Sequence, residues 1–220
     1  MKLIVSEGVD SSGKATQSHL LYENLIKKGI KVFAAEFPNY KIRSSELVKM
    51  YLTGDFGKDA NDVNPYAASV FFAADRVATY KTEWLSVTDD VIIADRYTTS
   101  NMIHQAAKFN DLKDKENFLN WIFDFEYEKL KLPVPDLTIF LDMPVKYAQN
   151  LMKNRPNKIN NSSVKDIHES NEEYLQKSYD NAVYVAEKFG WKRICCVENE
   201  RIKTPEEISN EVLSEALKIL

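Results

Sequence analysis

The sequence predicts a doubly wound α/β domain in which a five-stranded parallel sheet is covered by helices on both faces. Short, nearly continuous apolar segments alternate with longer segments of helical periodicity along the whole chain. The apolar segments are rich in β-branched residues, as is typical of strands buried on both faces of a parallel sheet. The chain has 220 residues, and we therefore expect one three-layer domain over residues 1–220.

The elements follow in a regular order. The predicted strands are residues 2–6, 30–36, 90–95, 136–142 and 193–198. The predicted helices are residues 14–28, 43–53, 64–87, 96–108, 115–130, 144–153, 166–189 and 205–219. Gly29 is placed to end the first helix, and Thr204, Pro205 and Glu207 form a capping box that begins the last one.

Composition excludes several partners. The formal net charge of −4 argues against a protein that binds nucleic acid by neutralising many phosphates. No apolar run is long enough for a bilayer and the N-terminus lacks a signal-peptide pattern, so we expect no membrane contact and a cytoplasmic location. Cys195 and Cys196 are adjacent on a predicted strand. They point to opposite faces, as expected for two unpaired thiols in a reducing compartment.

A phosphate-binding loop follows the first strand, in the stretch "EGVDSSGKATQ" (residues 7–17). Gly8, Gly13 and Lys14 match the pattern GxxxxGK, between a strand and a helix. Backbone N–H groups of such a loop and the dipole of the following helix bind phosphate oxygens, and the lysine adds a positive charge. The sequence therefore predicts a P-loop nucleotide-binding fold. The residues expected to bind ATP are Gly8, Ser11, Ser12, Gly13, Lys14, Ala15 and Thr16.

The loop departs from its pattern at Ala15, where a hydroxyl normally contacts Mg²⁺; the hydroxyl comes one residue later, at Thr16. Asp95 lies at the carboxyl end of a core strand, at the same sheet edge as the loop. We expect Asp95 to bind Mg²⁺ together with water, and Thr16 to contact a phosphate oxygen. Taken alone, the missing hydroxyl also fits a degenerate nucleotide site.

Two further motifs carry charged and aromatic groups. "DRYTTSNMIHQ" (residues 95–105) places Arg96 beside Asp95, either as a plain salt bridge or as a cation that spans donor and acceptor phosphates. "FFAADR" (residues 71–76) places Phe72 and Arg76 on one helical face. Such a pair is suited to stacking on a base and reading its carbonyl edge, although Phe72 is equally a core residue.

The polar segment 153–166 interrupts the strand–helix alternation. It is either a lid over the phosphates or a passive surface loop. Its cations, among them Arg155, favour the lid.

Taken together, these motifs resemble those of the thymidylate (dTMP) kinases. The resemblance rests on "EGVDSSGK", "FPNY" (37–40), "FFAADR", "DRYTTSN" (95–101), "PDLTIFLD" (135–142) and "DIHE" (166–169), in order along almost the whole chain. It implies that the protein transfers the γ-phosphoryl group of ATP to dTMP with Mg²⁺ as cofactor. It also implies a homodimer.

The resemblance further implies a role for single residues. Asp10 would accept a hydrogen bond from the sugar, and Phe37 and Tyr40 would flank the acceptor phosphate. Phe72 would stack on thymine and Arg76 would donate to its O4 atom. The expected nucleoside pocket is completed by Tyr97, Ser100, Asn101 and Gln105, with Asn101 or Gln105 near thymine N3. The expected catalytic residues are Lys14, Asp95, Arg96 and Arg155, with Arg155 closing on ATP.

The chain also departs from the family pattern. The phosphate loop lacks the arginine that some members carry, Arg155 is the only arginine of the polar segment, and Tyr40 stands where other members have arginine. The alternatives that remain are a kinase of another deoxynucleoside monophosphate, such as dUMP, a nucleotide-binding protein without catalysis, and an ATPase that acts on a macromolecule. The last explains neither "FFAADR" nor "FPNY".

Overall fold

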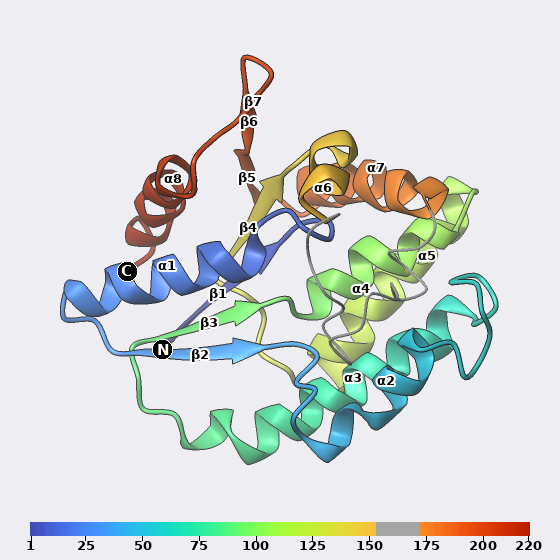
Figure 1. Ribbon diagram of the computed structural model, residues 1–220. Coiled ribbons are helices and arrows are strands. Elements are labelled where there is room, and N and C mark those ends of the chain that lie inside the picture. Colours follow the sequence, from blue (N-terminus) through green and yellow to red (C-terminus); the bar gives the residue numbers. More distant parts are fainter. Residues whose placement is uncertain (153–171) are drawn as a thin grey trace.

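The computed structural model describes residues 1–152 and 172–220 (Figure 1). A five-stranded parallel sheet in the order β2–β3–β1–β4–β5 forms its centre, which confirms the predicted fold class. The strands are β1 (Lys2–Glu7), β2 (Val32–Glu36), β3 (Val91–Asp95), β4 (Leu137–Asp142) and β5 (Lys192–Cys195). The expected lid, residues 153–166, lies outside the described residues.

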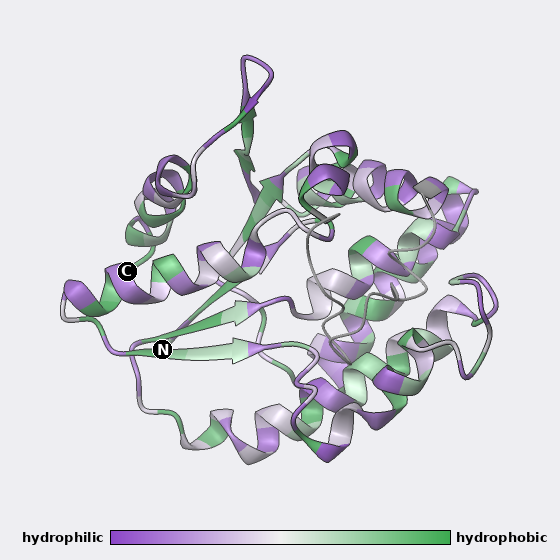
Figure 2. Cartoon of the chain, viewed as in Figure 1, coloured by the Kyte–Doolittle hydropathy of each residue, from purple (hydrophilic) through white to green (hydrophobic). Residues whose placement is uncertain are grey.

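The helices cover both faces of this sheet (Figure 1). Alternation along the strands divides the core: Ile4 packs on one face with residues of α1 and α8, while Leu3 and Val5 pack on the other with residues of α4 and α5. Figure 2 shows the central strands as predominantly apolar. The helices are α1 (Lys14–Lys27), α2 (Glu46–Leu52), α3 (Pro65–Thr82), α4 (Thr98–His104), α5 (Leu112–Phe123), α6 (Val145–Met152), α7 (Glu172–Lys188) and α8 (Pro205–Leu217).

The strand order fixes where a ligand binds. From β1 the chain passes to β2 and β3 on one side of the sheet and later to β4 and β5 on the other. The direction in which the chain adds strands to the sheet thus changes at β1. In open α/β sheets, ligands bind at such a point, beyond the carboxyl ends of the strands. The registers Ser6↔Asp95 and Glu36↔Asp95 bring the ends of β1, β2 and β3 level with one another.

Several helices are less regular than the sequence predicts. The predicted helix 115–130 consists of α5 followed by a π-helix, Asp124–Lys129 (η4). The predicted helices 43–53, 64–87 and 96–108 each include a short 3₁₀ turn: Arg43–Ser45 (η1), Trp84–Ser86 (η2) and Ala106–Lys108 (η3). The capping box of α8 is confirmed, since Thr204 Oγ1 accepts from the Glu207 N–H at 3.2 Å and Glu207 accepts from the Thr204 N–H at 2.7 Å.

The predicted strand 193–198 is split. After β5, Val197–Glu198 (β6) pairs antiparallel with Arg201–Ile202 (β7). The φ angles of Asn199 and Glu200 are 48° and 60°, and two successive positive φ angles are what a tight two-residue hairpin turn requires. In the described part of the chain, every helix is too short or too polar to cross a membrane.

Candidate active site

The phosphate loop lies between β1 and α1, at the point where the strand order reverses. Gly8 has a φ of 155°, and a Cβ there would lie 2.5 Å from Ser12 Oγ and 2.9 Å from the carbonyl oxygen of Leu141. Glycine is therefore required for the loop to pass this close to β4. Gly13, with a φ of 93°, is the N-cap of α1 and supplies no side chain to bond the first N–H groups of the helix. This helix start is suited to binding an anion.

Lys14 is folded back over the loop. Its Nζ donates to the carbonyl oxygens of Gly8 at 2.8 Å and Val9 at 2.7 Å, and the side chain is buried. Burial, followed by the positive charge of Arg96, lowers the pKa of Lys14 to about 7, against the opposing effect of nearby carboxylates. The ammonium group is thus held at the loop in surroundings that disfavour its charge. A phosphate group bound beside it would stabilise the charged form.

The other loop residues differ in their exposure. The hydroxyl oxygens of Ser11 and Ser12 are buried and bond no group in residues 1–152 or 172–220. Ala15 and Thr16 are exposed in the first turn of α1. The serine hydroxyls are therefore additional donors available to a phosphate, whereas Ala15 brings no oxygen.

Arg96 directly follows β3, and its side chain contacts the phosphate loop. Its backbone φ is 68°, and its N–H donates to Ser6 O at 3.1 Å. The guanidinium forms an ion pair with Asp10 and lies 3.2 Å from Nε2 of His104 through Nη1. Burial acts to lower the pKa of Arg96, but the carboxylates around it, Asp10 first, act more strongly and raise it. The cation of the "DRYTTSNMIHQ" motif thus lies at the phosphate loop.

The residues present fit a Mg²⁺ ion with few protein ligands. Asp95 is buried at the end of β3, and its Oδ1 atom bonds no described group. Across residues 1–152 and 172–220, no three His, Cys, Asp or Glu side chains are grouped so as to hold a metal. Mg²⁺ commonly takes one or two carboxylates together with phosphate oxygens and water. Asp95 is suited to be that carboxylate.

Glu7 is a buried member of the site that the sequence analysis missed. It is fully buried at the end of β1. Its carboxylate accepts from Thr99 Oγ1 at 2.6 Å and from Ser100 Oγ at 2.8 and 3.0 Å. Burial raises the pKa of Glu7, although Arg96, these hydroxyls and Lys14 oppose the rise. Strand alternation was the available signal, because it places Glu7 on the same face as Leu3 and Val5, toward α4.

A second buried carboxylate, Glu126, organises the predicted base-binding residues. Arg76 donates to Glu126 through Nε at 2.6 Å and Nη2 at 2.5 Å, and both side chains are buried. Asn101 donates to the same carboxylate at 3.2 Å. Phe72, on the same helix as Arg76, packs edge-on against Tyr51, with ring centroids 6.0 Å apart. Nothing local in the sequence marks Glu126, because its partner Arg76 lies 50 residues away.

Two of the predicted substrate residues lie in an aromatic cluster. Phe37 and Tyr97 are buried against Trp84, with centroid distances of 5.7 Å and 5.6 Å, and the Tyr97 and Trp84 rings are stacked. Tyr40 packs at the edge of the apolar cluster that contains Phe72. Gln105 is buried, and both polar atoms of its amide bond no described residue. Substrate contacts of these four residues stay predictions. Arg155 lies outside the described residues.

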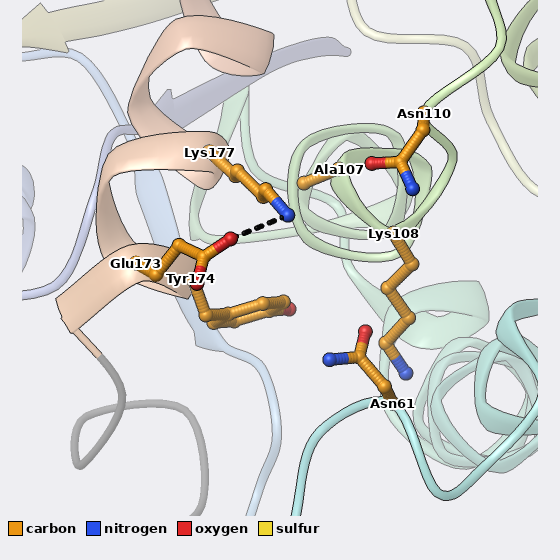
Figure 3. Close-up of a pocket in the computed structure, with 7 residues that line it drawn as sticks. All are labelled: Asn61, Ala107, Lys108, Asn110, Glu173, Tyr174 and Lys177. Atoms are coloured by element: carbon orange, nitrogen blue, oxygen red, sulfur yellow. Dashed lines mark ion pairs between the residues drawn. The ribbon is translucent and has the colours of Figure 1, made fainter.

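A polar pocket of about 320 Å³ lies beside the end of α4 (Figure 3). Figure 3 shows Glu173 and Lys177 of α7 joined by an ion pair on one side, and Lys108 and Asn61 on the other. Lys108 donates to Tyr51 OH and to Val63 O, each at 3.1 Å. Burial lowers the pKa of Lys108 to about 8, partly opposed by Asp59. Because Tyr51 packs against Phe72, this pocket adjoins the predicted base-binding region without containing its residues.

The fold and the phosphate loop define a P-loop nucleotide-binding protein, and Arg96 lies beside that loop in an ion pair with Asp10. Comparisons with known proteins name the family. The family model described as thymidylate kinase matches residues 6–204. A probable thymidylate kinase of Thermococcus onnurineus is 31% identical over 96% of this chain and 95% of its own. The thymidylate kinase of Mycobacterium tuberculosis is 30% identical over 83% of each chain.

A solved structure of thymidylate kinase from Candida albicans has a TM-score of 0.71 and 20% identity, covering 99% of this chain and 91% of that one. At this identity the likeness concerns the fold. The family match and the relatives show more: the chain belongs to the thymidylate kinase family, whose members are phosphotransferases, and phosphorylation of dTMP is the activity that this membership supports.

Proposed function

We propose that the protein transfers the γ-phosphoryl group of ATP to dTMP, giving ADP and dTDP. The observation that carries this is the contact between the phosphate loop and the end of β3, where Asp10 forms an ion pair with Arg96. Lys14 bonds a carbonyl oxygen of the loop, and Arg96 is near enough to lower its pKa, so a phosphate bound at the loop would meet both cations.

The reaction needs no strong general base, because the acceptor phosphate of dTMP is already an anion. Alignment and charge neutralisation supply most of the rate in such reactions. The backbone N–H groups of residues 8–14 bind the donor phosphates, with Lys14 beside them. Arg96 lies between donor and acceptor, where negative charge develops. Asp95 would hold Mg²⁺, which would supply positive charge beside the donor phosphates.

The acceptor is recognised on the side of α3 and α4. Phe72 offers an aromatic face for the base, and Arg76 and Asn101 offer polar groups beside it. Ser100 of α4 donates a hydrogen bond to Glu7 at the end of β1, which ties α4 to the strand that leads into the phosphate loop. Arg155 stays a proposed contact to ATP.

A coupled ADP-release assay over a panel of nucleoside monophosphates tests the proposal. We expect dTMP, with ATP and Mg²⁺, to give the highest kcat/KM. Faster turnover of another monophosphate would replace dTMP as the substrate. Tight binding of ATP and dTMP without dTDP, under any divalent metal, would instead show a protein that has lost catalysis.

We further infer that the protein is a single-domain, cytoplasmic homodimer. Leu47 and Met50 of α2 and Val70 of α3 are large apolar residues exposed to 43%, 38% and 44%, and the two helices pack together. Large apolar residues exposed on neighbouring helices are commonly covered by a partner where they form one patch. Light scattering on the purified protein tests the dimer, and Met50→Lys should shift it to the monomer.

The two free cysteines, Cys195 and Cys196, are consistent with a reducing compartment, as expected for a cytoplasmic protein.

A further inference from the structure

Glu126 bonds Arg76, which the family resemblance expects at thymine O4, and Asn101, one of the two residues expected near thymine N3, the other being Gln105. It is fully buried on the π-helix Asp124–Lys129. Its Oε2 accepts from Arg76 Nε at 2.6 Å and from Thr98 Oγ1 at 2.8 Å. Its Oε1 accepts from Arg76 Nη2 at 2.5 Å and from Asn101 Nδ2 at 3.2 Å. One carboxylate thus joins α3, α4 and η4. Short π-helical segments are rare and occur frequently at functional sites.

The first consequence is a fixed orientation of Arg76. A guanidinium has five N–H donors in a rigid plane. Two of them donate to Glu126, and a third, on Nη1, donates to the carbonyl oxygen of Tyr97 at 3.3 Å. The bidentate pairing sets the plane of the group and leaves the outer N–H groups as donors for a ligand.

The second consequence is a fixed orientation of the Asn101 amide. An ionised carboxylate only accepts hydrogen bonds, so the NH₂ group of Asn101 must face Glu126. Its other N–H donates to the carbonyl oxygen of Ser69 at 3.3 Å. Both donors of the amide are therefore used, and its oxygen is the group left to accept a hydrogen bond from a ligand.

The orientations of Arg76 and Asn101 together define which pyrimidine fits. Thymine has an acceptor at O4 and a donor at N3–H. Cytosine has the reverse, an amino donor at position 4 and an acceptor at N3. A donor from Arg76 and an acceptor from Asn101 match thymine and oppose cytosine. We propose that Glu126, by orienting Arg76 and Asn101, is a positioning residue that sets the selectivity of the enzyme for dTMP over dCMP. This proposal rests on the proposed function.

The deciding variant is Glu126→Gln. Its amide has a donor as well as an acceptor, so Asn101 is free to turn and Arg76 loses its charged partner. We expect the ratio of kcat/KM for dTMP to that for dCMP to fall by about tenfold or more, the range set by one or two hydrogen bonds to charged groups. The ratio for dTMP against dUMP should not change, because uracil has the same polar edge as thymine. The KM for ATP should also stay the same.

Glu128→Gln is the matched control, since Glu128 lies on the same π-helix but is exposed. It should leave both ratios unchanged. An unchanged dTMP-to-dCMP ratio in Glu126→Gln would overturn the proposal, because a general loss of packing lowers kcat/KM for all three acceptors alike and leaves the ratios as they are. An equal fall in the dTMP-to-dUMP ratio would also overturn it, because uracil has the same polar edge as thymine. If Glu126→Gln does not fold, Glu126→Asp decides. Its shorter side chain withdraws the carboxylate from Arg76 and Asn101, and a wild-type ratio in that variant would overturn the proposal.

The wild-type enzyme separates this proposal from the proposed function. Turnover of dTMP and dCMP at equal kcat/KM would reject the role of Glu126 and leave dTMP phosphorylation standing. No turnover of dTMP would reject the proposed function. Titration calorimetry with dTMP and dCMP would then still test whether Glu126→Gln changes the preference in binding.

Discussion

Asp10 of the phosphate loop forms an ion pair with Arg96, the residue that follows β3, across 86 positions of sequence. Both side chains are mostly buried, with 14% and 16% of their surface exposed. The pair holds the guanidinium of Arg96 at the phosphate loop. A phosphate group that binds Arg96 must therefore compete with the carboxylate of Asp10.

Replacing Arg96 should therefore affect turnover more than binding. We expect Arg96→Gln to lower kcat by about 10²–10³-fold, as for other donors that stabilise charge in the transition state. The KM for ATP should change little, because the phosphate loop and Lys14 remain. Steady-state kinetics with dTMP measure both. Arg201→Gln, on the exposed β6–β7 hairpin, is the control and should match the wild type. A kcat of Arg96→Gln within threefold of the wild type would contradict this role.

Nucleotide binding should take up a proton at Lys14. The pKa of Lys14 is lowered to about 7, so above that pH much of the substrate-free protein has lost this proton. Phosphate groups beside Lys14 favour the charged form and raise its pKa again. At about pH 8.5 we expect binding of a non-hydrolysable ATP analogue to take up about one proton. At about pH 6 we expect almost none from this group.

Calorimetry in two buffers of different ionisation enthalpy measures the uptake. Lys14→Met should remove it and weaken binding. Equal proton uptake by the wild type and Lys14→Met at the higher pH would show that Lys14 does not titrate on binding.

The sequence predicts much of the site and misses its buried supports for a physical reason. The phosphate loop and the end of β3 are found because each is a local pattern attached to a strand, and the parallel sheet brings strand ends together. Glu7 and Glu126 act through partners 92 and 50 residues away. No local pattern records such pairings, and an isolated glutamate in a sequence reads as a surface residue.

The aromatic residues show a related limit of sequence analysis, because a motif does not tell whether a ring binds a ligand or packs in the core. Phe37 and Tyr97 stand in motifs that resemble substrate-binding ones, and the structure packs both rings against Trp84. A sequence motif gives the position of an aromatic ring along the chain. Whether the ring faces a ligand or the core depends on which distant side chains pack against it.

Ala15→Thr should strengthen the response to Mg²⁺. Ala15 brings no oxygen to the first turn of α1, and a threonine there restores the hydroxyl that commonly contacts the metal. We expect the Mg²⁺ concentration for half-maximal activity to fall several-fold, with the KM for dTMP unchanged. Ala15→Val is the matched control, because valine has the shape of threonine without its hydroxyl. If the two variants respond to Mg²⁺ alike, the hydroxyl is not what changes the metal affinity.

Gly8→Ala should disrupt the phosphate loop through its backbone. The added Cβ would lie 2.5 Å from Ser12 Oγ and 2.9 Å from Leu141 O, closer than such atoms approach. Gly190 also has a positive φ, 64°, but a Cβ there meets no described atom within 4 Å. Gly190→Ala should therefore cost only the strain of its backbone, about 1–2 kcal/mol of unfolding free energy, and leave binding of the ATP analogue intact.

Gly8→Ala should lose that binding, and adding Ser12→Ala should not restore it. The contact with Ser12 Oγ is removed in the double variant, but the contacts with Cβ of residue 12 at 3.2 Å and with the Leu141 carbonyl of β4 at 2.9 Å remain. Calorimetry on Gly8→Ala, Ser12→Ala and the double variant, with urea denaturation to measure stability, separates the two contacts from the loss of the Ser12 hydroxyl. Restored binding in the double variant would show that the Ser12 side chain, and not the approach of the loop to β4, requires glycine at position 8.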